Sequence, residues 1–384
     1  MTTGTVEQLP ETHEIHTSGR KSYKGCRRRW NWIFNEQYYP LRTAKPLEFG
    51  TAYHAAMEVY YDPQTWNMDR EVIGARSIIK FVDVCEAQKA KALELKDEQY
   101  LPDEVEQDYQ ERVELGKGML RYYFEKVAPT ADELFIPVKV EVKFSVPVMD
   151  PTKDFNEQLI CECHNLPVSY DGRIDMLAQD HRGDYWIFDW KTCRSVAPSD
   201  EFLYLDDQIG SYVWALNFLK LPVRGFVYHE QRKGFPGPPK RNASRRLGRL
   251  FSVAKNQDTD LETYLHTVQR EDPEAMAEGL YNDFLHYLEE EGTMFWKRYQ
   301  IHKNHDELIS IAEGISWEAW EMTRKTTPLY PNSGRFSCTT CAFRQPCLGM
   351  NSGEDYQYTL NTLFERREHY WLRETPSTES KGGE

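Results

Sequence analysis

Apolar residues recur at helical spacing in the first third of the chain. This periodicity predicts helices near residues 50–61, 69–96 and 102–127. Asp69 and Asp103 stand at the starts of the second and third segments, where acidic side chains favour a helix N-terminus. Residues 50–130 are therefore expected to be a helical region.

The pattern then changes to that of strands. Residues 135–148 alternate apolar and polar side chains, and two more strands are expected at residues 169–180 and 184–192, with turn residues between them. The later elements are a helix at 202–220, a strand at 223–230, a basic loop at 233–249, helices at 261–270 and 273–289, an apolar run at 294–301, a helix at 306–324 and a cysteine-bearing loop at 338–347. Three strands followed by a helix and a strand predict a compact α/β core.

This order of elements fits one elaborated domain. We expect it to cover residues 16–350, after a flexible tail at 1–15 and before a C-terminal extension at 351–384 that ends in a flexible tail. Its parts are the helical region at 50–130, the α/β core at 134–230, a basic loop and helices at 231–330, and the cysteine loop at 331–350.

Composition narrows the class of protein. The chain is 40% hydrophobic and 28% charged, which disfavours a disordered or fibrous protein. It has no run of the ~20 apolar residues that a membrane helix needs, and no membrane partner is expected. Its first fifteen residues are polar and lack the apolar centre of a secretory signal. We therefore expect a cytoplasmic protein, in the cytoplasm of the bacterial host if a phage encodes it, whose eight cysteines serve metal or redox chemistry rather than disulfides.

The charge is distributed unevenly. The net charge is −14, yet residues 17–35 carry six Lys or Arg and no acid, and residues 231–250 carry seven and no acid. Local blocks of one sign in a field of the other are typical of a localised phosphate contact. Two solvated loops without a partner are the alternative interpretation.

Two carboxylates and a lysine are expected to converge in the α/β core. Asp189 and Lys191 share one face of a strand because side chains alternate along it, and Trp190 takes the other face. Asp175 would lie beside them if its strand pairs antiparallel with theirs. This group suits phosphoryl chemistry with a divalent metal ion, although an ordinary ion pair at a strand end is the alternative.

Side chains on two helices could complete such a site. His54 and Glu58 are four residues apart and can face one point, and Gln208 and Tyr212 repeat this spacing on a later helix. Glu141, on the first strand, is a weaker candidate.

These motifs, in this order, resemble a known family. GTAYHAAME, DGRIDM, FDWKT and Gln208-Ile209-Gly210-Ser211-Tyr212 are similar to the motif set of the RecB-like branch of the PD-(D/E)XK nuclease superfamily. The closer resemblance is to the CRISPR-associated, Cas-four-like and helicase-linked nucleases that carry an iron–sulfur cluster. It extends over residues 23–347 and implies a restriction-endonuclease-like core, in which helices flank a mixed central sheet.

The resemblance also implies roles for individual residues. His54, Asp175, Asp189 and the backbone carbonyl of Trp190 would bind Mg²⁺ or Mn²⁺, and Lys191 would be the catalytic lysine. Gln208 and Tyr212 would steady the site or the substrate strand. The chain departs from the family pattern at Asp189, where Glu is commoner.

The cysteines are a further feature. Cys338, Cys341 and Cys347 cluster in one loop and need a fourth ligand to close a four-coordinate site. The family pattern implies Cys26 for that position and favours a [4Fe–4S] cluster that staples the two ends of the domain. Zn²⁺ remains the other occupant, because the spacing alone accepts both. Cys85 is interpreted as a core residue, and the Cys161-x-Cys163 pair as structural.

The sequence thus predicts a metal-dependent DNA exonuclease. It would hydrolyse phosphodiester bonds at DNA ends or in single strands, in DNA recombination, repair or processing. The chain has no phosphate-loop motif, so a helicase or recombination protein would be a separate partner. The alternatives are a non-catalytic nucleic-acid-binding module with a structural metal cluster and a nuclease that trims DNA for CRISPR adaptation.

Overall fold

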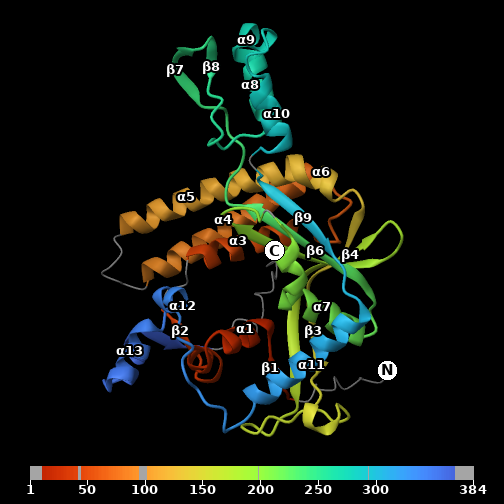
Figure 1. Ribbon diagram of the computed structural model, residues 1–384, viewed down its shortest axis with the longest axis vertical. Coiled ribbons are helices and arrows are strands. Elements are labelled where there is room, and N and C mark those ends of the chain that lie inside the picture. Colours follow the sequence, from red (N-terminus) through yellow and green to blue (C-terminus); the bar gives the residue numbers. More distant parts are fainter. Residues whose placement is uncertain (1–10, 42–44, 95–101, 198, 293, 368–384) are drawn as a thin grey trace, which may run out of the picture. The chain divides into compact units, whose positions relative to one another are not determined.

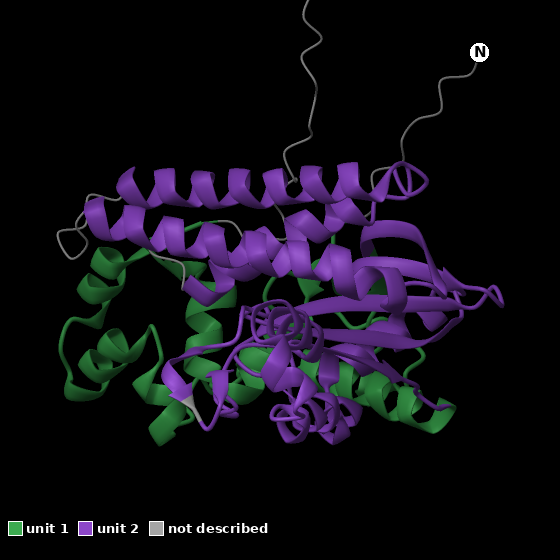
Figure 2. Ribbon diagram, turned by 90° about the horizontal axis from the view of Figure 1, so that it is seen from above, with its two compact units in different colours: residues 1–43, 144–172, 305–384 green, residues 44–143, 173–304 purple. Residues whose placement is uncertain are grey.

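The computed structural model describes residues 11–41, 45–94, 102–197, 199–292 and 294–367 (Figure 1). The chain divides into two compact units made of alternating segments (Figure 2). Unit 1 comprises residues 1–43, 144–172 and 305–384, and unit 2 comprises residues 44–143 and 173–304. Because the units interleave along the chain instead of meeting at one linker, the single domain expected at 16–350 stays a prediction.

Unit 2 contains the expected α/β core. Its elements are α3 (Lys45–Tyr60), α4 (Arg70–Glu94), α5 (Pro102–Tyr122), the π-helical turn η2 (Tyr123–Val127), α6 (Ala128–Ala131), most of β3 (Phe135–Pro147) and of β4 (Val168–Asp180), β5 (Tyr185–Cys193), the 3-10 turn η4 (Glu201–Leu205), α7 (Asp207–Phe218), β6 (Val223–Arg232), β7 (Arg241–Arg246), β8 (Arg249–Phe251), α8 (Leu261–Glu271), α9 (Pro273–Ala277), α10 (Asn282–Glu290) and β9 (Trp296–Ile301).

The sheet of this unit is mixed. Strands β4, β5, β6 and β9 are neighbours in that order, and β3 also pairs with β4. The β4–β5 and β6–β9 pairs are antiparallel, whereas β5 and β6 are parallel. Helices α3, α4 and α5 bury their apolar faces against β5 and its neighbours in one core that includes Phe81, Phe188 and Trp190. The prediction of a mixed sheet flanked by helices is confirmed.

Hydrogen bonds to two aspartate side chains explain where α7 begins and how β4 turns into β5. The Asp206 carboxylate accepts hydrogen bonds from the backbone N–H groups of Gln208 and Ile209, which caps α7 and separates it from η4. The expected helix at 202–220 therefore starts as a 3-10 turn. The Asp180 carboxylate likewise fixes the β4–β5 turn, in which Gly183 adopts a φ of +90°.

The basic segment expected to be a loop contains a hairpin. Strands β7 and β8 pair antiparallel through a turn at Leu247 and Gly248, which have φ values of +51° and +79°. Positive φ at both turn residues is the geometry of a tight hairpin turn. The loop prediction was wrong because β7 is rich in arginine, so its sequence shows no apolar alternation. The expected helix at 273–289 is also broken, at Gly279, where φ is +72°.

Unit 1 is built from both ends of the chain. It contains β1 (His13–Ile15), α1 (Thr17–Gly25), α2 (Arg27–Trp30), the π-helical turn η1 (Asn31–Asn35), β2 (Tyr38–Pro40), the 3-10 turn η3 (Pro151–Lys153), α11 (His305–Met322), α12 (Arg335–Thr339), α13 (Arg344–Ser352), α14 (Tyr356–Leu363) and β10 (Phe364–Arg366). The start of β4 lies here too and pairs in parallel with β1, while β10 pairs with β2.

Three expectations for unit 1 need correction. The N-terminal tail expected at 1–15 includes the strand β1, which gains backbone partners on β4. The cysteine segment expected to be a loop forms α12 and α13, and it is followed by α14 and β10. Residues 1–10 and 368–384, where flexible tails were expected, lie outside the described residues. No helix in the described ranges is long and apolar enough to cross a membrane.

Candidate active site

The β4–β5 hairpin brings the predicted carboxylates together. Met176 pairs with Phe188, and the backbone N–H of Trp190 donates a hydrogen bond to Asp175 Oδ2 at 3.1 Å. The Trp190 side chain enters the core of unit 2, so the neighbouring residues Asp189 and Lys191 take the other face of β5. The antiparallel pairing expected from the sequence is confirmed.

Asp189 is the buried centre of the group. Only 4% of the residue is exposed, and Lys191 Nζ lies 2.6 Å from its Oδ2. Gln208, on α7, donates to Asp189 Oδ1 at 3.0 Å, whereas Tyr212 lies one turn further along the buried face of this helix. Burial raises the pKa of Asp189 to about 6; Lys191 opposes the shift and Asp175 adds to it.

Asp175 pairs with the predicted histidine. His54 Nδ1, on α3, lies 3.1 Å from Asp175 Oδ2. Burial by itself would raise the pKa of Asp175, but His54 and Lys191 outweigh burial and lower it. Burial would likewise lower the pKa of His54, and Asp175 raises it instead. Opposite charges thus compensate each other within one buried group.

An ion pair between β3 and β4 extends the group. Glu141 has a left-handed φ of +50° within the strand, and its Oε2 lies 2.8 Å from Arg173 Nε. Burial raises its pKa to about 7; Arg173 opposes this shift, while Asp175 and Glu58 add to it. The weaker sequence candidate therefore does belong to the neighbourhood of Asp175, and Arg173 was missed. The Gly-Arg-Ile-Asp run contained the signal, since a strand period of two puts Arg173 and Asp175 on one face.

The donor set fits a divalent cation chemically. Carboxylate oxygens, an imidazole and the Trp190 carbonyl are oxygen and nitrogen ligands of the kind that Mg²⁺ and Mn²⁺ accept. Within the described ranges, however, His54, Asp175 and Asp189 are not among the groups whose ligand atoms all lie within 4.8 Å of one another. The Lys191 ammonium instead neutralises Asp189. A nearby positive charge, from a side chain or from an ion, stabilises the ionised form of a buried carboxyl group.

A buried polar network, which the sequence did not reveal, supports the strand behind this group. The indole N–H of Trp190 donates to Tyr123 Oη at 3.3 Å, and Arg298 Nη2 donates to the same oxygen at 2.9 Å. Arg298 Nη1 also donates to Asp132 Oδ1 at 2.7 Å, while Tyr61 donates to the other Asp132 oxygen. These contacts fix the side chain of Trp190, the residue between Asp189 and Lys191 in the sequence.

The four predicted cluster cysteines all lie in unit 1. Arg28 Nη1 lies 3.2 Å from Cys347 Sγ. Burial raises the pKa of the Cys341 thiol, and Cys26 and Cys338 are near enough to add to the shift. In the part of the chain that the structure describes, the four sulfurs do not form a group whose members all lie within 4.8 Å of one another. The expected iron–sulfur site is thus not a closed group of ligands here.

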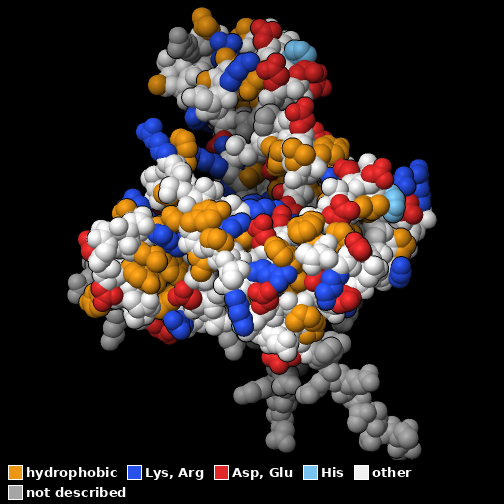
Figure 3. All heavy atoms as spheres, turned by 60° about the horizontal axis from the view of Figure 1, so that its bottom comes forward, with side chains coloured by type: hydrophobic (Ala, Val, Ile, Leu, Met, Phe, Trp, Pro, Cys, Tyr) orange, Lys and Arg blue, Asp and Glu red, His pale blue; other side chains and the backbone are white. Residues whose placement is uncertain are grey.

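The two basic segments are partly neutralised by neighbouring acids. In the first, Arg20 and Lys24 pair with Glu318, at 2.7 and 3.0 Å. In the second, Arg245 pairs with Asp272 at 2.9 Å. Lys and Arg side chains are interspersed with Asp and Glu on the face of the molecule that Figure 3 shows. The phosphate-binding islands expected from the sequence are therefore less basic than the local composition suggests.

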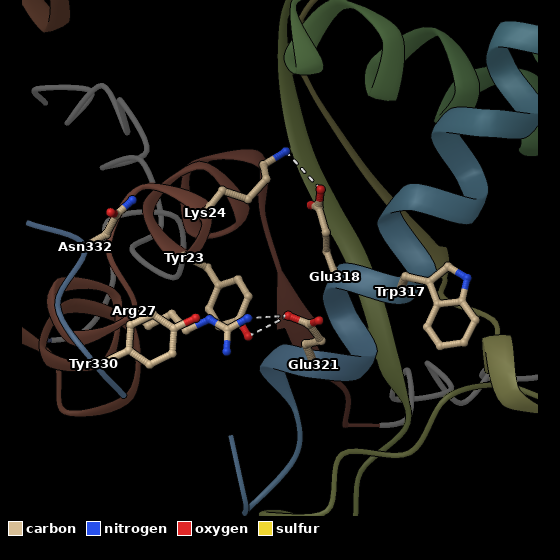
Figure 4. Close-up of a pocket in the computed structure, with 8 residues that line it drawn as sticks. All are labelled: Tyr23, Lys24, Arg27, Trp317, Glu318, Glu321, Tyr330 and Asn332. Atoms are coloured by element: carbon tan, nitrogen blue, oxygen red, sulfur yellow. Dashed lines mark hydrogen bonds and ion pairs between the residues drawn. The ribbon is translucent and has the colours of Figure 1, made fainter. Parts of the chain in front are cut away.

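A pocket of 370 Å³ in unit 1 illustrates this neutralisation (Figure 4). Arg27 Nη2 lies 2.7 Å from Glu321, and Tyr23 donates to the same carboxylate at 3.0 Å. The pocket is lined by Tyr23, Lys24, Arg27, Trp317, Glu318, Glu321, Tyr330 and Asn332. Its cations already have carboxylate partners, so it does not offer an unpaired basic surface for phosphate.

The comparison with protein families agrees with the motif order and the fold. A model of the PD-(D/E)XK nuclease superfamily matches residues 17–348, which include the carboxylate group, Lys191 and the four cysteines. A search of curated proteins finds no significant match. Since the family model covers most of the sequence, the chain belongs to the PD-(D/E)XK nuclease superfamily.

Proposed function

We propose that the protein is a metal-dependent DNA exonuclease that acts on DNA ends or single strands. The observation that supports it most is the convergence of Asp175 and Lys191 on the buried Asp189, in a chain that belongs to a nuclease superfamily. The expected setting is DNA recombination, repair or processing, with any motor protein on a separate chain.

Each side chain has a role in this proposal. Asp175, Asp189, His54 and the Trp190 carbonyl would hold the cation, and Gln208 would keep Asp189 oriented through its 3.0 Å hydrogen bond. A bound Mg²⁺ or Mn²⁺ would supply Lewis acidity at the scissile phosphate. Lys191, whose ammonium lies beside Asp189, would place its positive charge near the negative charge that develops on the phosphate oxygens. Tyr212 would contact the substrate strand.

The experiment compares linear and covalently closed circular DNA of the same sequence. End-labelled single- and double-stranded substrates are incubated with the full chain and Mg²⁺, Mn²⁺ or EDTA. The proposal predicts degradation from the ends with either metal, no degradation in EDTA and intact circles. Cleavage of circular DNA as fast as of linear DNA would contradict the exonuclease assignment, and stable linear DNA in every reaction would contradict the nuclease function.

We further propose that Cys26, Cys338, Cys341 and Cys347 bind one [4Fe–4S] cluster. Four thiolates on a single zinc ion lie about 3.8 Å apart, given 2.3 Å bonds and tetrahedral angles. Thiolates that each bind a different iron of a cluster lie farther apart. The support for the proposal is the resemblance in motif order together with the nearness of Cys26 and Cys338 to Cys341. Protein purified anaerobically should be brown and contain about four irons per chain. Zinc without iron would contradict the cluster.

A further inference from the structure

A second set of soft metal ligands meets in unit 1, away in sequence from both sites described above. The ligand atoms of His13, Cys161 and His164 all lie within 4.8 Å of one another. His13 comes from β1, whereas the other two belong to the turn that precedes β4. The sequence analysis interpreted the Cys161-x-Cys163 pair as structural because its spacing is short for a metal site. His13, the partner in the fold, lies about 150 residues earlier in the chain.

The geometry of this set matches one tetrahedral ion. Cys161 Sγ lies 3.5 Å from His164 Nδ1. A sulfur at 2.3 Å and a nitrogen at 2.0–2.1 Å from a shared zinc ion are separated by about 3.5 Å at the tetrahedral angle. The imidazole rings of His13 and His164 have centroids 5.1 Å apart. The nitrogen–sulfur spacing is therefore already that of a loaded site.

The turn holds its ligands without needing an ion. The backbone N–H of Cys161 donates to Leu166 O at 2.8 Å, and Asn165 N–H donates back to Cys161 O at 2.8 Å with Asn165 at a left-handed φ of +55°. The backbone N–H groups of Cys163 and His164 also hydrogen-bond to the Cys161 sulfur. Burial nevertheless raises the pKa of this thiol, so an ion would have to displace its proton on binding.

His13, on the other side of the group, is also held by backbone contacts. The backbone N–H of His13 donates to Pro167 O at 2.9 Å, and His13 is paired with Val168 in the parallel β1–β4 ladder. These backbone contacts hold His13 beside the turn that carries Cys161 and His164.

We propose that His13, Cys161, Cys163 and His164 bind one structural Zn²⁺ ion. His13, Cys161 and His164 supply three ligands, and Cys163 lies outside that close group but its side chain hydrogen-bonds to that of Cys161. A turn of Cys163 toward the ion would close a Cys₂His₂ set, for which zinc is the common occupant. Cys161 is buried at 1% exposure, while Cys163 and His164 are exposed and leave a route for the ion. The ion ties the strand β1 to the turn before β4 and so fixes the N-terminal edge of the sheet in unit 1.

The test measures zinc on the full chain. Protein is stripped with EDTA, saturated with Zn²⁺, separated from free ion and analysed for metal, and its affinity is measured against a chromophoric chelator. Cys163→Ser and His164→Ala change exposed side chains, and His266→Ala changes an exposed histidine of α8 as the matched control. Any metal on the four predicted cluster cysteines is common to all these proteins, so the difference in zinc content between them reports this site.

We expect the wild type and His266→Ala to bind one more zinc per chain than the two site variants. Affinity should fall by at least ~100-fold in each variant, because even the hydrogen-bond partners of ligands change metal affinity by 10–100-fold. Co²⁺ in place of zinc should give a thiolate charge-transfer band that weakens in Cys163→Ser. Equal zinc content in all four proteins would overturn the proposal, as would a Cys161–Cys163 disulfide in protein that binds no zinc here.

Discussion

The ion pair between Arg298 and Asp132 should be among the most important polar contacts for the stability of unit 2. Both side chains are less than 10% exposed, and the Arg298 guanidinium also donates to Ala131 O at 2.6 Å and to Tyr123. Arg298→Met removes all these donors and leaves Asp132 buried with Tyr61 as its remaining partner. Breaking a buried pair from one side costs about 3–5 kcal/mol, so we expect a loss of this size in the free energy of unfolding.

The loss should depend on pH in a defined direction. Burial already raises the pKa of Asp132, and without Arg298, whose charge opposes that shift, the pKa must rise further. A carboxyl group with a raised folded-state pKa stabilises the fold when it is protonated, and this stabilisation is lost as the pH rises through that pKa. The deficit of Arg298→Met relative to the wild type should therefore be larger at pH 8 than at pH 5.

Urea denaturation followed by circular dichroism measures both effects. Lys45→Met, which removes an exposed partner of Asp108, is the control and should unfold close to the wild type. In Arg298→Met/Asp132→Asn no buried charge is left alone, so the double variant should be at least ~1 kcal/mol more stable than the sum of the single changes predicts. Strict additivity, or a cost for Arg298→Met no larger than that of Lys45→Met, would refute the reasoning.

Three further predictions concern helix packing, acid stability and the cysteines. Gly116→Ala should lower the urea midpoint because its Cβ would lie 2.1 Å from the Phe81 ring, whereas Gly50→Ala, with open space around it, should gain up to ~1 kcal/mol in the unfolding free energy. Burial and Arg298 lower the pKa of His229 well below its usual value. Below pH 6.5 this histidine therefore takes up a proton only in the unfolded chain, and the free energy of unfolding falls as the pH decreases. His229→Asn should make this fall less steep. Cys26→Ser should reduce the iron content of anaerobically purified protein, and an unchanged iron content would exclude Cys26 as a ligand.

Periodicity was a good guide to the elements that form the core of unit 2. The helices α4 and α5 and the hairpin of β4 and β5 follow from apolar spacing because their apolar faces are the ones that pack. It failed where backbone geometry at single residues decides the structure. The hairpin of β7 and β8 depends on positive φ at Leu247 and Gly248, and β1 forms because β4 supplies its partners.

The same distinction holds for the candidate site. Side-chain alternation placed Asp189 and Lys191 together, and the resemblance in motif order implied Gln208, which donates a hydrogen bond to Asp189. Residues that are far apart in the sequence but in contact in the fold could not be predicted from these spacings. Arg298 reaches the tyrosine that holds Trp190 only through the folding of β9 beside β6, and His13 reaches Cys161 only through the pairing of β1 with β4.

The most direct test of the nuclease function is the rate of end-labelled DNA degradation by Lys191→Ala with Mn²⁺. Lys139→Ala, an exposed lysine on β3, is the matched control. The Asp189 pKa of about 6 should rise when Lys191 is lost, so the carboxyl group becomes neutral and the fold should persist, as circular dichroism can verify. We predict at least a ~10²-fold lower rate for Lys191→Ala and a wild-type rate for Lys139→Ala. A folded Lys191→Ala protein that degrades DNA at the wild-type rate would contradict the proposed active site.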